Sequence, residues 1–85
     1  MITLSDRVLH KPTGETWVVL YADYDSGYLM PMGWPQCEAR IEDCGLVEKA
    51  SESQRNKYAN DLRVGSHPAR KKALRLFEQQ RSNPL

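Results

Sequence analysis

The first half of the chain shows short apolar runs separated by residues that favour turns. Residues 15–22 are the longest run and are rich in β-branched and aromatic side chains, which is typical of a central strand. Pro12 and Gly14 before this run, and Gly27 after it, fit hairpin turns. We therefore expect five short antiparallel strands, over residues 7–10, 15–22, 28–30, 38–41 and 46–48.

The predicted central strand is apolar on both faces. Because side chains alternate along a strand, Trp17, Val19 and Tyr21 are predicted to share one face, and the residues between them share the other face with Ala22. A strand that is covered on both sides belongs in a small curled sheet. Five short antiparallel strands joined by tight turns predict a small Src-homology-3-like β-barrel.

From Ser51 onward, helix-forming residues replace the β-branched ones. Ser51 and Gln54 have the spacing of a capping box, and Gly65 is a helix stop. Ser66 and Pro68 predict the start of a second helix. The expected fold class is therefore α+β, with the five-stranded barrel followed by two short C-terminal helices. Apolar residues at helical spacing mark the faces that should pack, namely Tyr58, Ala59 and Leu62, then Ala69, Ala73, Leu74, Leu76 and Phe77.

Charge divides the chain into two regions. Residues 1–50 contain four basic and eight acidic residues, a net charge of −4, whereas residues 51–85 contain eight basic and three acidic residues, a net charge of +5. At 85 residues the chain has room for one domain, with an acidic β-barrel region and a basic helical region. The asymmetry predicts an anionic partner for the basic region, or attraction between the two regions within one molecule or across a homodimer.

The lack of a recognisable targeting signal and the low cysteine content predict a cytoplasmic protein. No segment has the length and hydrophobicity of a membrane span, and residues 1–7 lack the features of a signal peptide. We therefore expect a cytoplasmic protein with no membrane partner. Cys37 and Cys44 have no second pair, which predicts two reduced thiols rather than a disulfide framework or a zinc site.

Side chains suited to catalysis are present, but nothing in their spacing brings them together. Cys37 and His10 have the chemistry of a nucleophile and its base. Together with Cys44 and His67 they also carry zinc-binding atoms, without the close paired spacing of zinc motifs. The sequence contains no glycine-rich phosphate loop. We therefore expect no enzyme, with no catalytic residue, no metal ligand and no cofactor.

Aromatic side chains near predicted loops are the first candidates for partner binding. Trp34 lies between Gly33 and Pro35, where regular strand pairing is not expected, so its ring either plugs the barrel or contacts a partner. Tyr24 and Tyr28 flank the predicted hairpin tip and are expected to add to the same surface. Such rings anchor protein interfaces or stack on nucleic-acid bases. Trp17 and Tyr21 lie in mid-strand, which favours the core.

Basic side chains of the helical region are the second group of candidates. A face of this kind neutralises phosphates or steers a charged protein into place. The acidic residues of the first half are the competing interpretation, because they can pair with these cations within the molecule. The candidates are Arg63, Arg70, Lys71, Lys72 and Arg75.

Three segments of the first half form a pattern: residues 6–19 (DRVLHKPTGETWVV), 33–35 (GWP) and 43–47 (DCGLV). This pattern resembles a family of small uncharacterised proteins encoded by phages and prophages. The resemblance covers about the first 48 residues and, more loosely, residues 65–76. It implies a phage setting, an N-terminal Src-homology-3-like barrel and a short basic helix, and it carries no established active site. Short phage proteins commonly bind and block host machinery, which favours antagonism of a host factor.

Three hypotheses for function follow. The first is a non-enzymatic phage-type protein that binds a host protein or nucleoprotein and inhibits or redirects it, for example in anti-defence. The second is direct nucleic-acid binding by the basic C-terminal helix, which predicts a steep loss of affinity as salt rises. The third is capture of a small nucleotide-like ligand by Trp17, Trp34 and Arg40.

Overall fold

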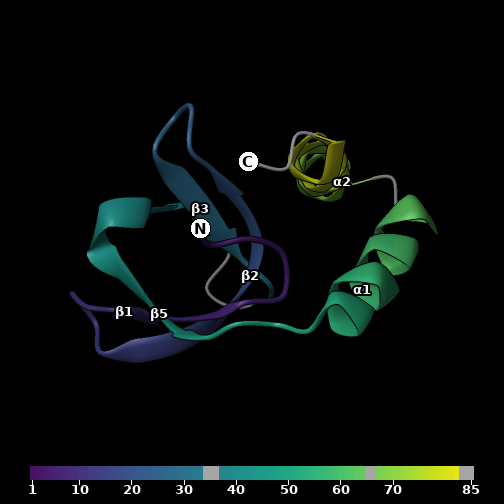
Figure 1. Ribbon diagram of the computed structural model, residues 1–85. Coiled ribbons are helices and arrows are strands. Elements are labelled where there is room, and N and C mark those ends of the chain that lie inside the picture. Colours follow the sequence, from purple (N-terminus) through teal and green to yellow (C-terminus); the bar gives the residue numbers. More distant parts are fainter. Residues whose placement is uncertain (34–36, 65–66, 83–85) are drawn as a thin grey trace.

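The sheet comes first in the chain and the two helices follow it (Figure 1). The computed structural model describes residues 1–33, 37–64 and 67–82. The predicted α+β class, with five antiparallel strands before two helices, is confirmed. The elements are β1 (Arg7–His10), β2 (Glu15–Asp23), β3 (Tyr28–Pro31), β4 (Ala39–Arg40), the 3₁₀ helix η1 (Ile41–Asp43), β5 (Cys44–Glu48), α1 (Glu52–Val64) and α2 (Pro68–Ser82).

The strands form one antiparallel sheet in the order β4-β3-β2-β1-β5. β2 is the long curved strand of Figure 1 and joins the two halves of the sheet, because its first part pairs with β1 and its second part pairs with β3. Within the described residues β4 and β5 are the two edges, so the sheet is not closed. The structure therefore confirms the predicted five-stranded antiparallel sheet, but in the described ranges it does not show the closed barrel that was also expected.

The bounds of β4 and β5, on either side of η1, differ most from the prediction, while β2 and β3 each end one residue later than predicted. β4 is shorter than the predicted residues 38–41, and β5 begins at Cys44 rather than at Leu46. The turn is held from both sides: the Ile41 N–H donates to the Gly27 carbonyl, and the Lys11 N–H donates to the Asp43 carbonyl, each at 2.9 Å. These backbone bonds stabilise η1 in place of an extended strand.

A β-bulge reverses the expected side-chain alternation of β2. The register against β3 shifts between Val19 and Tyr21, and an extra residue in one strand moves all later side chains to the opposite face. Trp17, Val19 and Ala22 consequently belong to one core, whereas Tyr21 belongs to another. The prediction that Tyr21 shares a face with Trp17 and Val19 was wrong.

Two apolar cores hold the molecule together. The first lies within the curled sheet, and the second lies between the sheet and the helices, so both helices pack on the sheet. The predicted stripe of α1 contributes Ala59 and Leu62 to the second core, while Tyr58 stays 38% exposed. The first core contains Ile2, Val8, Trp17, Val19, Ala22, Leu29 and Cys44, and the second contains Leu4, Tyr21, Ala59, Leu62, Ala73 and Phe77.

The start of α1 has the predicted cap. The Gln54 N–H donates to the Ser51 hydroxyl and the Ser51 N–H donates to the Gln54 side-chain carbonyl, each at 3.1 Å. The predicted helix stop at Gly65 and the predicted N-cap at Ser66 lie outside the described residues.

The buried carboxylate of Asp6 joins the sheet to the start of the helical region. Its side chain is fully buried and accepts hydrogen bonds from the Ala50 N–H at 2.8 Å and the Thr3 N–H at 3.0 Å. It also pairs with Arg55 at 2.9 Å and Lys49 at 3.0 Å. Burial by itself would raise the pKa of Asp6, but these four partners outweigh it and hold the pKa below its usual value.

Candidate functional site

A groove at the start of α2 brings together residues from the sheet and the helix. We call it the α2 groove. It has a volume of about 590 Å³. The sheet contributes the bulge residue Leu20 and the end of β3, while α2 contributes its first turn. The groove is lined by Leu20, Met30, Pro31, Gly33, His67, Ala69 and Arg70.

Two of the five predicted basic residues are bound within the molecule. The Lys72 ammonium lies 3.4 Å from the Asp23 carboxylate and 4.8 Å from the centre of the Tyr21 ring, so it holds α2 against the sheet. Four hydrogen bonds, from Ser26, Lys72 and Asp25, outweigh burial and hold the pKa of Asp23 below its usual value. Arg63 pairs with Glu78 at 3.8 Å between the helices. Lys72 therefore follows the competing interpretation, in which the acidic region pairs with the basic one.

The other three predicted basic residues form an exposed surface, which we call the basic face: Arg70, Lys71 and Arg75. None of the three has an ion pair within the described part of the chain. α2 has no acidic residue in its first turn, and cations at this end oppose the helix macrodipole. The basic face therefore does not help to stabilise α2. Arg70 also lines the α2 groove, so one cation of the basic face lies at the groove.

The predicted aromatic residues are placed at a separate hollow of about 250 Å³ at the β2–β3 hairpin tip. Tyr24 and Tyr28 line it and are 45% and 42% exposed. The Tyr24 hydroxyl already accepts a hydrogen bond from the Ile2 N–H at 2.8 Å. Gly33 lies beyond the other end of β3 and lines the α2 groove, so the two tyrosines do not share a surface with Gly33. Trp34 itself lies outside the described residues.

The mid-strand aromatic residues are buried, as predicted. Trp17 is 6% exposed, and its ring stacks on that of His10 with centroids 4.1 Å apart. Tyr21 donates a hydrogen bond to Glu38 at 3.0 Å, and burial together with this carboxylate raises the pKa of Tyr21 to about 12. Arg40 lines the hairpin-tip hollow and pairs with Glu42 at 3.3 Å. Trp17 therefore belongs to the first core, whereas Arg40 lines the hairpin-tip hollow, and Trp34, the third residue of the nucleotide-capture hypothesis, lies outside the described residues.

The thiols have contrasting environments. Cys37 is exposed and Cys44 is buried, and both are free. Burial raises the pKa of the Cys44 thiol, and the nearby Asp43 carboxylate raises it further. In the described ranges no three His, Cys, Asp or Glu side chains are grouped so that they could hold a metal ion. No helix there has the length and hydrophobicity to span a membrane.

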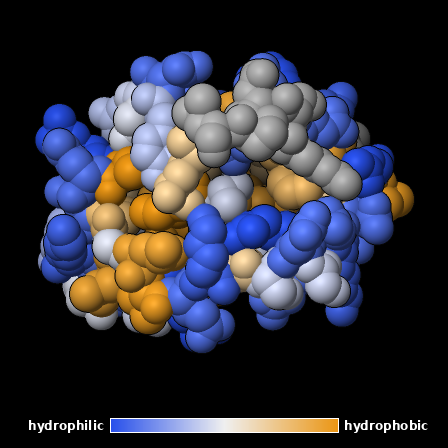
Figure 2. Space-filling model, viewed as in Figure 1, coloured by the Kyte–Doolittle hydropathy of each residue, from blue (hydrophilic) through white to orange (hydrophobic). Residues whose placement is uncertain are grey.

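Two surfaces were missed by sequence reasoning. Figure 2 shows apolar side chains gathered on the left of the molecule, over the part of the sheet that contains β1, β5 and η1 in Figure 1. The exposed apolar residues of these strands are Leu9, Leu46 and Val47, and β5 is a sheet edge. The sequence signal was the Leu46-Val47 pair in a predicted last strand. An unpaired edge strand of this kind can pair with another chain.

The second missed surface is a hollow of about 290 Å³ where the N-terminal segment meets both helices. Thr3, Arg55, Phe77 and Gln80 are among the residues that line it. The Thr3 hydroxyl donates to the Gln80 side chain at 2.7 Å. No local pattern could reveal this hollow, because residues 77 positions apart form its walls.

Comparisons with protein-family models, curated proteins and solved structures found no match.

Proposed function

We propose that this chain is a non-enzymatic, phage-type binding protein that engages a host protein or nucleoprotein and inhibits or redirects it, for example in anti-defence. The observation that carries the proposal is the α2 groove beside the basic face. An apolar hollow accepts an anchoring side chain, while exposed cations steer a partner into place. The phage setting is supported by the sequence pattern of residues 6–19, 33–35 and 43–47.

The ionisable groups that are paired inside the fold support a binding function rather than catalysis. The Asp6 carboxylate is occupied by four donors, and the Tyr21 hydroxyl is bound to Glu38. Lys72 is held by Asp23 and the Tyr21 ring. These groups stabilise the fold, and the groups left at the surface are suited to recognising a partner.

We also propose that the sheet is a Src-homology-3-like barrel that is open on one side. The strand order supports this interpretation, since β1 to β4 form a meander and β5 returns beside β1. The short η1 turn between β4 and β5 and the separate core inside the curled sheet agree with it. Small barrels of this kind leave their loops and outer surfaces available for recognition.

An affinity pull-down from bacterial lysate tests the proposal. The bait would be the intact protein, with and without nuclease, beside a variant in which Arg70, Lys71 and Arg75 are all changed to Glu. Lys11→Glu is the control, because Lys11 is an exposed cation on the β1–β2 turn. We expect one host protein to be retained regardless of nuclease, lost with the triple variant and kept with Lys11→Glu. Recovery of nothing, or of nuclease-sensitive material alone, would contradict the proposal.

Direct nucleic-acid binding is the second candidate function, and the exposed basic face favours it. If its three cations contact phosphates, the logarithm of the binding constant should fall against the logarithm of salt concentration with a slope of about −2 to −3. Fluorescence anisotropy of a labelled oligonucleotide between about 50 and 200 mM salt measures this slope. A protein partner held by an apolar anchor would show a much weaker dependence.

A further inference from the structure

We propose that the α2 groove binds an acidic peptide segment that carries one bulky apolar side chain. This inference rests on the proposed function, because it names the chemistry of the partner that the same surface would recognise.

The floor of the groove supplies the apolar half of this recognition. Leu20 and Met30 are half-buried: they pack partly against the second core and also line the groove. Pro31 and Ala69 add further carbon surface. The volume of about 590 Å³ lies within the range of about 300–1,000 Å³ that is usual for ligand sites. The groove is therefore large enough for an apolar anchor together with the backbone on either side of it.

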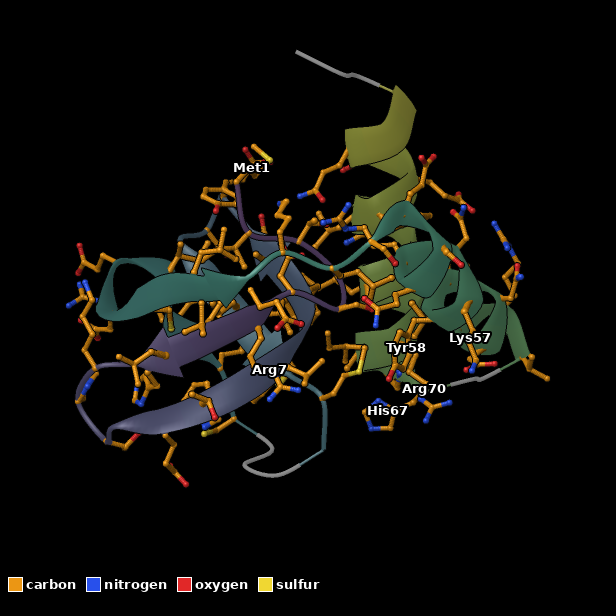
Figure 3. All side chains as sticks on the ribbon, turned by 60° about the horizontal axis from the view of Figure 1, so that its bottom comes forward. Met1, Arg7, Lys57, Tyr58, His67 and Arg70 are labelled. Atoms are coloured by element: carbon orange, nitrogen blue, oxygen red, sulfur yellow. The ribbon has the colours of Figure 1, made fainter. Side chains whose placement is uncertain are left out.

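The rim of the groove supplies the charged half. Arg70 lines it with an exposed guanidinium, and Lys71 follows as an exposed cation. His67 also lines it, and its Nδ1 accepts a hydrogen bond from the Ala69 N–H at 3.2 Å. Figure 3 shows the His67 and Arg70 side chains projecting from the start of α2. Among the described residues no carboxylate lines the groove. The charge therefore selects an acidic segment, whose carboxylates the planar guanidinium of Arg70 can bind in a bidentate manner.

The shape of the site favours a peptide over a nucleic acid. A phosphate backbone needs a row of cations, but Lys72 and Arg63 are already bound to Asp23 and Glu78. An apolar floor contributes to affinity only when an apolar group covers it. An acidic peptide with a Leu, Met, Phe or Trp anchor uses both features of the groove.

Selection from a displayed library of random dodecapeptides tests the inference. The intact protein is the target, and Arg70→Glu is the counter-target. We expect the selected peptides to place Asp or Glu on either side of one bulky apolar residue. The selected peptide is then synthesised with its anchor changed to Ala or its acids changed to Lys, and each change should weaken binding by at least about tenfold.

The matched control is Lys11→Glu, which makes the same charge change on an exposed cation of the β1–β2 turn that belongs neither to the groove nor to the basic face. Arg70→Glu should lose at least about tenfold in affinity, and Lys11→Glu should lose much less. Thermal unfolding of both variants shows that each one is folded. Selection of no peptide, of peptides without acidic residues, or of peptides that bind Arg70→Glu equally well would overturn the inference.

The two proposals fail in different ways. The pull-down could retain a host protein while the selection shows no preference for acidic peptides. That result would contradict the groove inference and would still support the proposed function. Displacement of the selected peptide by an oligothymidylate at equal concentration would assign the groove to nucleic acid, and would overturn the inference as well.

Discussion

Asp6 occupies a position where one side chain decides how two regions of the chain meet. Its carboxylate is fully buried between the N-terminal segment, the β5–α1 connection and α1. A buried charge is tolerated only when it is paired and hydrogen-bonded, and Asp6 meets that condition through Lys49, Arg55 and two backbone N–H groups.

Replacing Asp6 with Asn should destabilise the protein by about 3 kcal/mol, because the two cations lose their charged partner. The free energy of unfolding from urea titration measures this effect. Glu48→Gln on β5 is the control, since Glu48 is exposed and its change should stay within about 0.5 kcal/mol. Equal effects of the two substitutions would show that the Asp6 cluster adds no special stability.

The same residue predicts how stability depends on pH. The pKa of Asp6 is lower in the folded state than in the unfolded chain, where it is about 3.9. The stability it contributes is therefore fully present above that unfolded value and is lost as pH falls through the folded value. Urea midpoints measured from about pH 6 down to pH 2 should fall less steeply for Asp6→Asn than for the wild type. Parallel curves would contradict this assignment.

The two cysteines should differ in reactivity. A disulfide reagent such as DTNB should modify one thiol of the native protein quickly, because Cys37 is exposed. Cys44 should react only on unfolding, since it is buried and its pKa is raised. Cys37→Ser should remove the fast phase, and Cys44→Ser should keep it. Two fast thiols in the native wild type would show that Cys44 is accessible.

At the scale of elements, α1 shows how a local signal stabilises a helix with few apolar contacts. Ser51→Ala removes the capping hydroxyl and should lower the free energy of unfolding by about 1 kcal/mol. Ser53→Ala is the matched control, because Ser53 is an exposed residue inside the first turn of α1. Chemical denaturation of both variants gives the comparison. A larger loss for Ser53→Ala would rule out the cap as the stabilising feature.

α2 shows the opposite relation between local sequence and structure. Its first turns carry Arg70, Lys71 and Lys72, which are unfavourable at the N-terminal end of a helix. Tertiary contacts hold the helix instead, through Ala73 and Phe77 in the second core and through the Lys72–Asp23 pair. Two of these cations therefore remain available for a partner.

At the scale of the whole molecule, the second core makes the sheet and the helices depend on each other. Leu62→Ala on α1 should cost about 2–4 kcal/mol, since Leu62 is buried against residues from the N-terminal segment, β2 and α2. Tryptophan fluorescence reports on the sheet and circular dichroism at 222 nm reports on the helices. Both transitions should shift together, whereas a shift confined to the dichroism signal would show that the helices unfold separately.

The candidate site was predictable only in part. Arg70, Lys71 and Arg75 were found as basic residues of one helix and are exposed in the structure. Lys72 was predicted together with them, but its side chain contacts Asp23 and Tyr21, because neighbouring positions of a helix face in different directions. Local sequence cannot separate these outcomes, because the choice depends on where the sheet lies. The apolar floor of the α2 groove was missed for the same reason.

The sequence by itself determined the class of each element and most turn positions, because strand propensity, glycine at positive φ and the Ser51 cap act over a few residues. Only the tertiary structure decided which way the side chains of β2 face beyond its bulge. It also decided which cations are paired and where the sheet stays open. Those outcomes depend on contacts between residues far apart in the chain, whose geometry is set when the two cores pack together.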